Sequence, residues 1–272
     1  TAASNAAPPA KKDLNTIMIT AVVHTYNAEK HLKRVLEALQ GFDEVLVIDN
    51  ESTDSTRAIA ESFAKVRFIT KARNGHRCVE PHRQFGIEQA SNPWIFEVDA
   101  DEIVPPALRD YLYKHIEEHP EPHGLLIPIK NYFMGRWMRC YYPDYILRLF
   151  PKEGTVWPPT VHSRPQHRGP LMKIPRRRSD LAFIHLANET VGQTLAKMNT
   201  YTDIEVERRA PRYRRWQLFL SPPFRFFKTY VLKGGWREGM PGFIHAVHDA
   251  IYRFAIMAKI EEKRRGNTDI FY

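Results

Sequence analysis

One segment of the chain reads Trp94-Ile95-Phe96-Glu97-Val98-Asp99-Ala100-Asp101-Glu102, an apolar run that ends in three carboxylates. Such a run of aliphatic and aromatic residues predicts a buried strand of a parallel sheet. The acids at its end do not fit a core, because an unpaired buried charge is very costly. Open α/β sheets bind ligands outside the carboxyl ends of their strands, and Mg²⁺ prefers oxygen ligands. The segment therefore predicts a metal-binding strand end or, more simply, the acidic start of a helix at Pro105 and Pro106.

Composition and charge narrow the class of protein. The chain has 272 residues, of which 43% are hydrophobic and 26% charged, as expected of a globular protein with a full core. Its formal net charge of +9 favours anionic partners, namely phosphates, nucleic acid or an acidic membrane surface. The two cysteines, Cys78 and Cys140, lack metal-ligand spacing, so we expect a reducing compartment and predict a cytoplasmic protein. No uninterrupted apolar run reaches membrane-spanning length.

Strands and helices alternate over the first 120 residues. Short β-prone runs predict buried strands over 17–23, 45–48, 66–69 and 94–98. Between the first two runs, Leu32, Val35, Leu36 and Leu39 recur at helical spacing, with Asn27 as the expected N-cap. This alternation predicts an α/β fold with a mostly parallel, doubly wound sheet.

The character of the sequence changes along the chain and suggests four parts. Residues 1–13 are rich in Ala, Pro and small polar residues and predict a disordered leader. Residues 14–120 form the α/β half, and 121–205 add strands separated by Pro-, Gly- and Arg-rich loops. Residues 206–272 are basic and aromatic, and they predict terminal helices, the last over 241–265.

Three polar clusters follow predicted parallel strands. They are His24-Thr25-Tyr26-Asn27, the segment Asp49-Asn50-Glu51-Ser52-Thr53-Asp54, and Asp99 to Glu102. Because the carboxyl ends of parallel strands share one edge of a sheet, we expect these clusters to lie together as a nucleotide and metal site. Glycine-rich phosphate-binding motifs are absent from these turns, which disfavours a dinucleotide-binding or P-loop enzyme.

These three clusters, with the strands that precede them, resemble family 2 glycosyltransferases of the GT-A fold. The second half resembles the subgroup that glycosylates lipopolysaccharide core or related envelope glycans. The segments that carry this second likeness are Tyr142 to Phe150, Val161-His162, Ile184-His185 and Gly234 to Gly239. The resemblance implies a metal-dependent, inverting glycosyltransferase. Its expected donor is a nucleoside diphosphate sugar, with UDP-sugar as the first choice, and its acceptor a hydroxyl of a lipid-linked or envelope glycan.

The resemblance also implies roles for single residues on the donor side. Residues 14–120 become the nucleotide-sugar-binding half, and 121–205 the acceptor-side half of the same catalytic domain. Asp49 would hold the base or ribose, Asp99 would reach the ribose side, and Arg83 would lie near the donor. The remaining nucleotide-lining residues would be Thr25, Tyr26 and Asn27. From its sequence position alone, Arg83 could equally be an ordinary solvated arginine on a helix.

Metal and base are implied in the same way. Asp101, with His185, would bind the divalent cation, Mg²⁺ or Mn²⁺, although a histidine at a strand end is often only a hydrogen-bonded structural residue. Asp144 and His162 are the candidates for the general base that an inverting transfer requires. The subgroup usually has Glu after this histidine, whereas this chain has Ser163. Asp144 could alternatively pair with Arg148.

Two other functions fit parts of the sequence. A nucleotidyltransferase also uses an α/β sheet and carboxylate-bound metal, but it would carry a glycine-rich basic loop after the first strand. A basic nucleic-acid-binding protein would explain the charge, but acids at three strand ends would repel phosphates; we therefore expect no nucleic-acid partner. The 241–265 helix ends in Lys263-Arg264-Arg265, and aromatic and basic residues precede it. This pattern predicts either peripheral contact with an anionic membrane, on its inner face, or packing on the catalytic domain.

Overall fold

The computed structural model describes residues 17–75, 79–159, 163–188 and 190–266. The expected leader over 1–13 therefore lies outside the described residues, and so does His162. Contacts divide the chain into two compact units, each formed by two segments of the sequence. The first unit comprises residues 1–128 and 145–183, and the second comprises 129–144 and 184–272.

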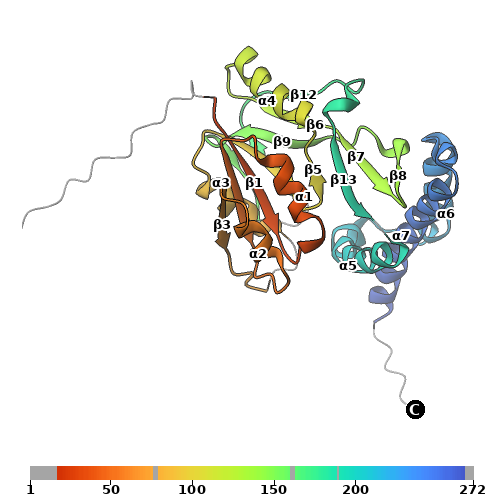
Figure 1. Ribbon diagram of the computed structural model, residues 1–272. Coiled ribbons are helices and arrows are strands. Elements are labelled where there is room, and N and C mark those ends of the chain that lie inside the picture. The colour runs from red at the N-terminus through yellow and green to blue at the C-terminus, as the bar shows by residue number, and fades with distance from the viewer. Residues whose placement is uncertain (1–16, 76–78, 160–162, 189, 267–272) are drawn as a thin grey trace, which may run out of the picture. The chain divides into compact units, whose positions relative to one another are not determined.

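A seven-stranded sheet forms the centre of the first unit (Figure 1). Its strand order is β12-β6-β9-β4-β1-β2-β3, and β1, β2, β3 and β4 run parallel. Only β9 is antiparallel to its neighbours β4 and β6. The strands are β1 (Ile19–Thr25), β2 (Glu44–Asp49), β3 (Val66–Thr70), β4 (Trp94–Asp99), β6 (Gly124–Ile127), β9 (Ile146–Pro151) and β12 (Leu171–Lys173). The prediction of a mostly parallel α/β sheet is thus confirmed.

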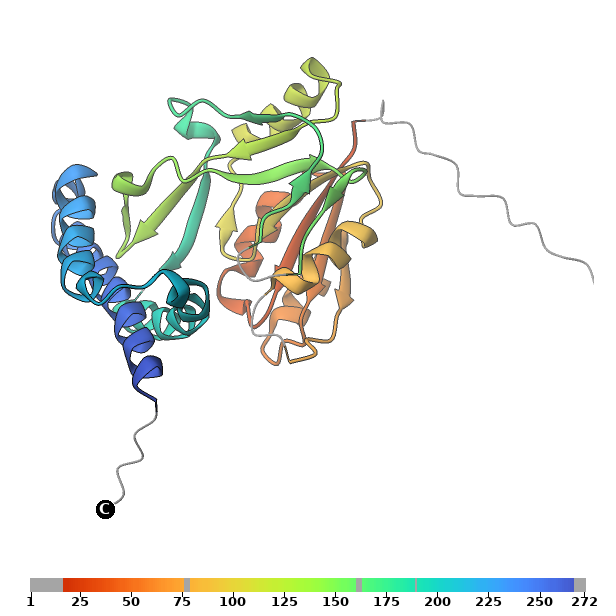
Figure 2. The same cartoon turned by 180° about the vertical axis from the view of Figure 1, so that it is seen from behind.

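Helices cover both faces of this sheet. Figure 1 shows α1 in front of the strands, and the reverse view in Figure 2 shows α3 in front of them. The helices of the first unit are α1 (Glu29–Leu39), α2 (Thr56–Glu61), α3 (Glu80–Gln89) and α4 (Pro106–Glu118). The short elements of this unit are β5 (Glu102–Ile103), β10 (Thr155–Val156), β11 (Gln166–His167) and η2 (Ser179–Leu181).

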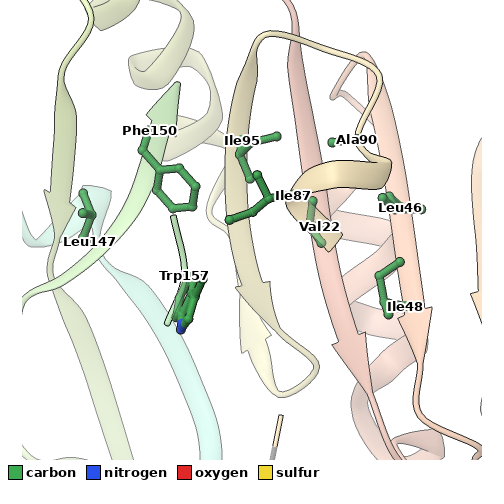
Figure 3. Close-up of a cluster of buried hydrophobic side chains, with 9 residues drawn as sticks. All are labelled: Val22, Leu46, Ile48, Ile87, Ala90, Ile95, Leu147, Phe150 and Trp157. Carbon is green, nitrogen blue, oxygen red and sulfur yellow. The ribbon is translucent and has the colours of Figure 1, made fainter. Parts of the chain in front are cut away.

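The sheet core forms where apolar residues repeat on both faces of the central strands. Every residue of β1 is buried, as expected for a β-branched strand between two helical layers. Figure 3 shows one cluster, in which Val22 and Ile95 of neighbouring strands pack with Ile87 of α3. Phe150 of β9 and Trp157 extend the same cluster. This core fixes α3 and β9 against the strands whose ends carry the polar clusters.

The second unit combines a small group of strands with a helical part. The strands β13 (Phe183–Asn188), β7 (Ile129–Phe133) and β8 (Arg136–Trp137) are neighbours in that order. The α-helices are α5 (Val191–Arg209), α6 (Trp216–Phe227) and α7 (Met240–Arg265), and both α5 and α6 pack on α7 (Figure 2). Shorter helical turns are η1 (Arg139–Tyr141), η3 (Ala210–Arg212), η4 (Lys228–Leu232) and η5 (Gly235–Glu238).

The glycines between α6 and α7 allow a close approach of η5 and α7. Gly234 has a φ of 76°, in the left-handed region that favours glycine. A Cβ atom on Gly242 would lie 1.9 Å from the carbonyl oxygen of Gly235, so no larger residue fits there without movement. The segment Gly234 to Gly239 therefore has a packing role in this unit. None of the helices in the described ranges combines the length and apolar character that a bilayer crossing requires.

Candidate active site

The strand register brings the three polar clusters to neighbouring positions at one edge of the sheet. Thr25 at the end of β1 lies opposite Asp49 at the end of β2. On the other side of β1, His24 lies opposite Asp99 at the end of β4. The three parallel strands therefore present their polar carboxyl ends at one edge, as the sequence predicts.

Asp49 is buried and fully oriented by its neighbours. Its Oδ1 accepts hydrogen bonds from the Thr25 hydroxyl at 2.8 Å and the Ser52 hydroxyl at 2.5 Å. Its Oδ2 accepts the backbone N–H of Ser52 at 2.9 Å. An ionised carboxylate offers about four acceptor positions, so one remains for a further donor.

Asn27 connects the loops that follow β1 and β2. Its backbone N–H donates to Ser52 Oγ at 2.8 Å, and its side-chain oxygen accepts the Thr53 N–H at 2.8 Å. Asn27 has a φ of 49°, a conformation that asparagine tolerates better than most residues. The prediction that Asn27 caps α1 is wrong, because Ala28 occupies the N-cap position and the Asn27 side chain bonds the neighbouring loop instead.

A cavity of about 110 Å³ lies beside this edge, entirely within the first unit. Tyr26 is half-exposed at its rim, and the Arg73 guanidinium lies 3.8 Å from the centre of the Tyr26 ring. The lining residues are His24, Thr25, Tyr26, Asn50, Arg73, Val79 and His82. An aromatic face, a cation and several hydrogen-bonding groups in one small cavity suit a planar heterocyclic ligand.

Beneath the third cluster lies a buried network of charges. Arg83 of α3 is 6% exposed and donates to Glu97 Oε2 at 2.9 Å and to Asp99 Oδ1 at 2.5 Å. Arg148 of β9 is 2% exposed and donates to Asp99 Oδ2 at 2.5 Å and to Glu102 Oε1 at 2.7 Å. Arg83 is thus no solvated surface residue, and Arg148 pairs with Asp99 and Glu102 rather than with Asp144.

The two guanidinium groups control the protonation state of Asp99. Burial alone would raise the pKa of Asp99, but Arg148 and Arg83 outweigh it and hold that pKa well below its usual range. Glu97 and Glu102 also lie in the network, where Glu97 contacts Arg83 and Glu102 contacts Arg148. His24 Nε2 lies 3.7 Å from Glu97 Oε2 at the buried end of the same network.

Asp101 lies in the turn between β4 and β5 and is partly exposed. Burial and Lys30 lower the pKa of His31 on α1, and the negative charge of Asp101 opposes that shift. Asp101 thus faces the start of α1. Among the residues that the structure describes, no group of three or more His, Cys, Asp or Glu side chains converges to hold a metal ion.

Asp144 and His185 belong to the second unit, where Asn131 joins them. The Asn131 amide N–H donates to Asp144 Oδ2 at 2.9 Å, and the Asn131 oxygen lies 2.7 Å from His185 Nδ1. Since that amide oxygen can only accept, His185 donates from Nδ1. Sequence reasoning missed Asn131, which lies in the middle of β7. Asp144 itself has a φ of 23°, a strained conformation of the kind that occurs at functional sites.

Residues 20–168 match the family model described as glycosyl transferase family 2. The chain belongs to glycosyl transferase family 2. This glycosyltransferase therefore has the GT-A fold predicted from its sequence, and the family assignment favours a glycosyltransferase over a nucleotidyltransferase.

Relatives match over nearly the whole glycosyltransferase chain. It is 28% identical to the lipopolysaccharide core biosynthesis glycosyltransferase LpsC of Rhizobium meliloti (strain 1021), over 92% of this chain and 96% of LpsC. It is 24% identical to the uncharacterized glycosyltransferase RT0209 of Rickettsia typhi, over 90% and 87% of the two chains. The crystal structure of S. aureus TarS 1–349 in complex with UDP-GlcNAc matches with a TM-score of 0.48 and 15% identity, over 92% of both chains.

The charge network generates a prediction about stability. Arg148→Met leaves the buried carboxylate of Glu102 and the partly exposed carboxylate of Asp99 without this partner, so the free energy of unfolding should fall by about 3–5 kcal/mol. Arg57→Met removes an exposed arginine that pairs with Glu61 on α2, so it should change stability by less than about 1 kcal/mol. Urea unfolding of the three proteins measures both effects, and similar losses in the two variants would contradict the assignment.

Proposed function

We propose that this glycosyltransferase moves a sugar from a UDP-sugar to a hydroxyl of a lipopolysaccharide core or related lipid-linked envelope glycan. The observation that carries the proposal is the alignment of three polar strand ends on one sheet edge, beside a cavity with an aromatic rim. The likeness to LpsC along the whole chain supports the acceptor class. Inversion of the anomeric centre is part of the proposal.

Asp49 and its neighbours are proposed to hold the nucleoside. Asp49 has one acceptor position left after its three internal hydrogen bonds, which suits an N–H of the base or a ribose hydroxyl. Tyr26 would contact the base, and Thr25 and Asn27 would shape the adjoining wall. Asp99 would reach the ribose side while Arg83 and Arg148 keep its carboxylate ionised and oriented.

The chemistry of the donor groups fits a divalent cation, Mg²⁺ or Mn²⁺. Both oxygens of Asp99 already accept from arginines, whereas Asp101 supplies a separate carboxylate at the same strand end. We propose Asp101 as a protein ligand of this cation, since hard divalent cations take carboxylate oxygens. The expectation that His185 is a second ligand stays a prediction. When bound, such a cation would neutralise negative charge that develops on the leaving diphosphate.

The metal proposal predicts a change in donor binding. Asp101→Asn should leave the fold intact and abolish the gain in UDP affinity that Mn²⁺ gives the wild-type protein, because an amide is a poorer ligand for a hard cation. Asp110→Asn, at an exposed position on α4, is the matched control and should retain that gain. Calorimetric titration with UDP, with and without Mn²⁺, makes the comparison; a full metal-dependent gain in Asp101→Asn would refute the ligand assignment.

Asp144 is proposed as the general base, with His162 as the alternative. The base takes the proton from the acceptor hydroxyl while that oxygen bonds to the anomeric carbon and the bond to the diphosphate breaks. Asn131 would orient the Asp144 carboxylate through its amide N–H, and His185 would in turn orient Asn131. The observed contacts give Asp144 a fixed direction without neutralising its charge.

This assignment predicts the kinetics of a single variant. Asp144→Asn should reduce turnover by about 10²–10⁴-fold and leave UDP affinity near the wild-type value, because only the proton acceptor is lost. His162→Ala should then keep most of its turnover. If the losses are reversed, the base is His162. Single-turnover measurements with donor and a membrane-extracted acceptor, together with calorimetry, distinguish the two.

We also propose peripheral contact with the inner face of an anionic membrane, through α6. The α6 face consists of Trp216, Phe219, Leu220 and Phe224, which recur at helical spacing and are 58–72% exposed. Exposed basic residues, Arg214 and Lys228, flank it. The second unit as a whole has 18 Lys and Arg residues against 10 Asp and Glu, so it carries +8 of the net charge of +9. Interfacial helices combine the same two features.

The basic residues at the end of α7 contact other residues of the second unit, which agrees with the packing alternative for this helix rather than with membrane contact. Lys263 forms an ion pair with Glu207, Arg264 donates to the backbone carbonyls of Ala210 and Tyr213, and Arg265 pairs with Glu261. The contacts of Lys263 and Arg264 bind α7 to α5 and to the segment 210–213, whereas the Arg265–Glu261 pair lies within α7. They support α6, rather than the end of α7, as the membrane-facing element.

Two variants test this surface. Each basic residue near an anionic surface contributes about 1 kcal/mol, but insertion also needs apolar side chains. Changing Trp216, Phe219 and Phe224 together to Ser should abolish flotation with vesicles that contain phosphatidylglycerol. Changing Lys263, Arg264 and Arg265 together to Gln should weaken it less. Failure of the wild-type protein to float, or a larger loss in the second variant, would reject the α6 face.

A further inference from the structure

The helical part of the second unit contains a cavity of about 380 Å³ that the proposed catalytic roles do not use. Helices α5, α6 and α7 and the turn η3 all contribute to its wall. The polar lining residues are Arg208, Arg209, Arg212, Gln217, Ser221 and Arg253. Its size falls within the range of small-molecule sites, which is about 300–1,000 Å³.

Positive charge in this cavity is not balanced by the protein. Arg208 and Arg209 share one carboxylate, Glu205, at 2.8 and 2.6 Å. Arg253 and Arg212 form no hydrogen bond or ion pair with any residue in the described parts of the chain. Four guanidinium groups therefore surround the cavity, and in the described parts of the chain their ion pairs involve a single carboxylate, that of Glu205.

Arg253 is the cavity arginine whose positive charge is least favoured by its surroundings. Burial, together with the positive charges of Arg209 and Arg225, lowers the pKa of Arg253, an unusual direction for an arginine. Arg225 is itself paired with Asp249, so the carboxylate nearest to it is already occupied. An anion in the cavity would remove this repulsion.

The donor groups of the cavity also select the kind of anion. Guanidinium groups can only donate hydrogen bonds, and they match the oxygens of phosphate in a bidentate manner. The Gln217 oxygen already accepts the backbone N–H of Arg214 at 3.0 Å, which leaves the amide N–H groups as donors. Ser221 adds a hydroxyl. The set as a whole suits a phosphomonoester, which is doubly charged and rich in acceptor oxygens.

Residues of the α6 face are close in sequence to residues that line this cavity. Gln217 and Ser221 line the cavity, while Trp216 and Phe219 of the same helix are exposed. A headgroup bound by the arginines would therefore lie close to side chains that suit the acyl boundary. This arrangement favours a phosphate carried by a lipid over a soluble one.

We propose that this cavity binds a phosphomonoester group of a lipid-linked acceptor, separately from the nucleotide-binding edge. The proposal rests on the proposed function for the nature of the acceptor, but the cavity and its charges are independent of it. A second anionic contact would position a phosphorylated glycolipid by its headgroup and select against uncharged acceptors.

The first experiment uses the full chain with saturating UDP, so that the nucleotide-binding edge is occupied. Calorimetric titration with inorganic phosphate at constant ionic strength should show saturable binding. Arg253→Gln and Arg212→Gln should each weaken it by about tenfold or more, because each removes charged hydrogen bonds. Arg265→Gln, an exposed position of equal charge on α7, should bind like wild type. No phosphate binding by wild type, or equal binding by all variants, would overturn the proposal.

A second readout separates binding from folding. Arg253→Gln without phosphate should be at least as stable to heat as wild type, because it removes repulsion and breaks no ion pair. A clear loss of stability would mean that Arg253 has a structural role and would overturn its assignment. UDP affinity is measured in parallel. If the wild-type protein does not bind UDP, the proposed function is refuted, whereas the phosphate titration still tests the cavity.

Vesicles identify the source of the phosphate. Flotation with phosphatidic acid, whose headgroup is a phosphomonoester, is compared with flotation with phosphatidylglycerol at equal surface charge. Wild type should bind phosphatidic acid vesicles several-fold better, and Arg253→Gln should lose this preference. Equal flotation of wild type with both vesicle types, despite binding of inorganic phosphate, would overturn the assignment to a lipid-linked group.

Discussion

The first unit depends on how Asp99 is held between two arginines. A carboxylate at the end of a central strand is costly to bury, and Arg83 and Arg148 offset that cost from two different elements. Arg83 comes from α3 and Arg148 from β9, so the same two ion pairs fix a helix and an antiparallel strand to the end of β4. The apolar cluster of Figure 3 joins the same elements and acts in the same direction.

The parts of the site that the sequence predicted are those with a local signal. A buried strand followed at once by polar residues is visible in the chain itself, and parallel pairing then brings such ends together whatever the exact register. Thr25, Asp49 and Asp99 could therefore be placed at one edge before any coordinates were known. The same reasoning could not find that Thr25 donates to Asp49, because that contact joins residues 24 positions apart.

The parts that the sequence did not predict depend on distant partners. An arginine in the run Arg148-Leu149-Phe150 has no local pattern that indicates burial against Asp99 and Glu102, 49 and 46 positions away. Asn131 likewise joins Asp144 and His185 from 13 and 54 positions away. Asn27 shows the converse error: its local sequence favours a helix cap, but hydrogen bonds to the next loop are formed instead. Tertiary contacts override local preference at such positions.

The net charge of the chain is unevenly distributed between the two units, which the overall composition does not reveal. The first unit has 22 Lys and Arg residues against 21 Asp and Glu, so it carries +1, and the second unit carries the other +8. A nearly balanced unit suits the proposed site, in which carboxylates would act together with a cation and a diphosphate. A strongly positive helical unit with exposed aromatic side chains suits an acidic, amphipathic ligand instead. The overall basicity that first suggested nucleic acid is thus concentrated in the second unit, where the exposed aromatic residues and arginines support the proposed contacts with lipid and phosphate.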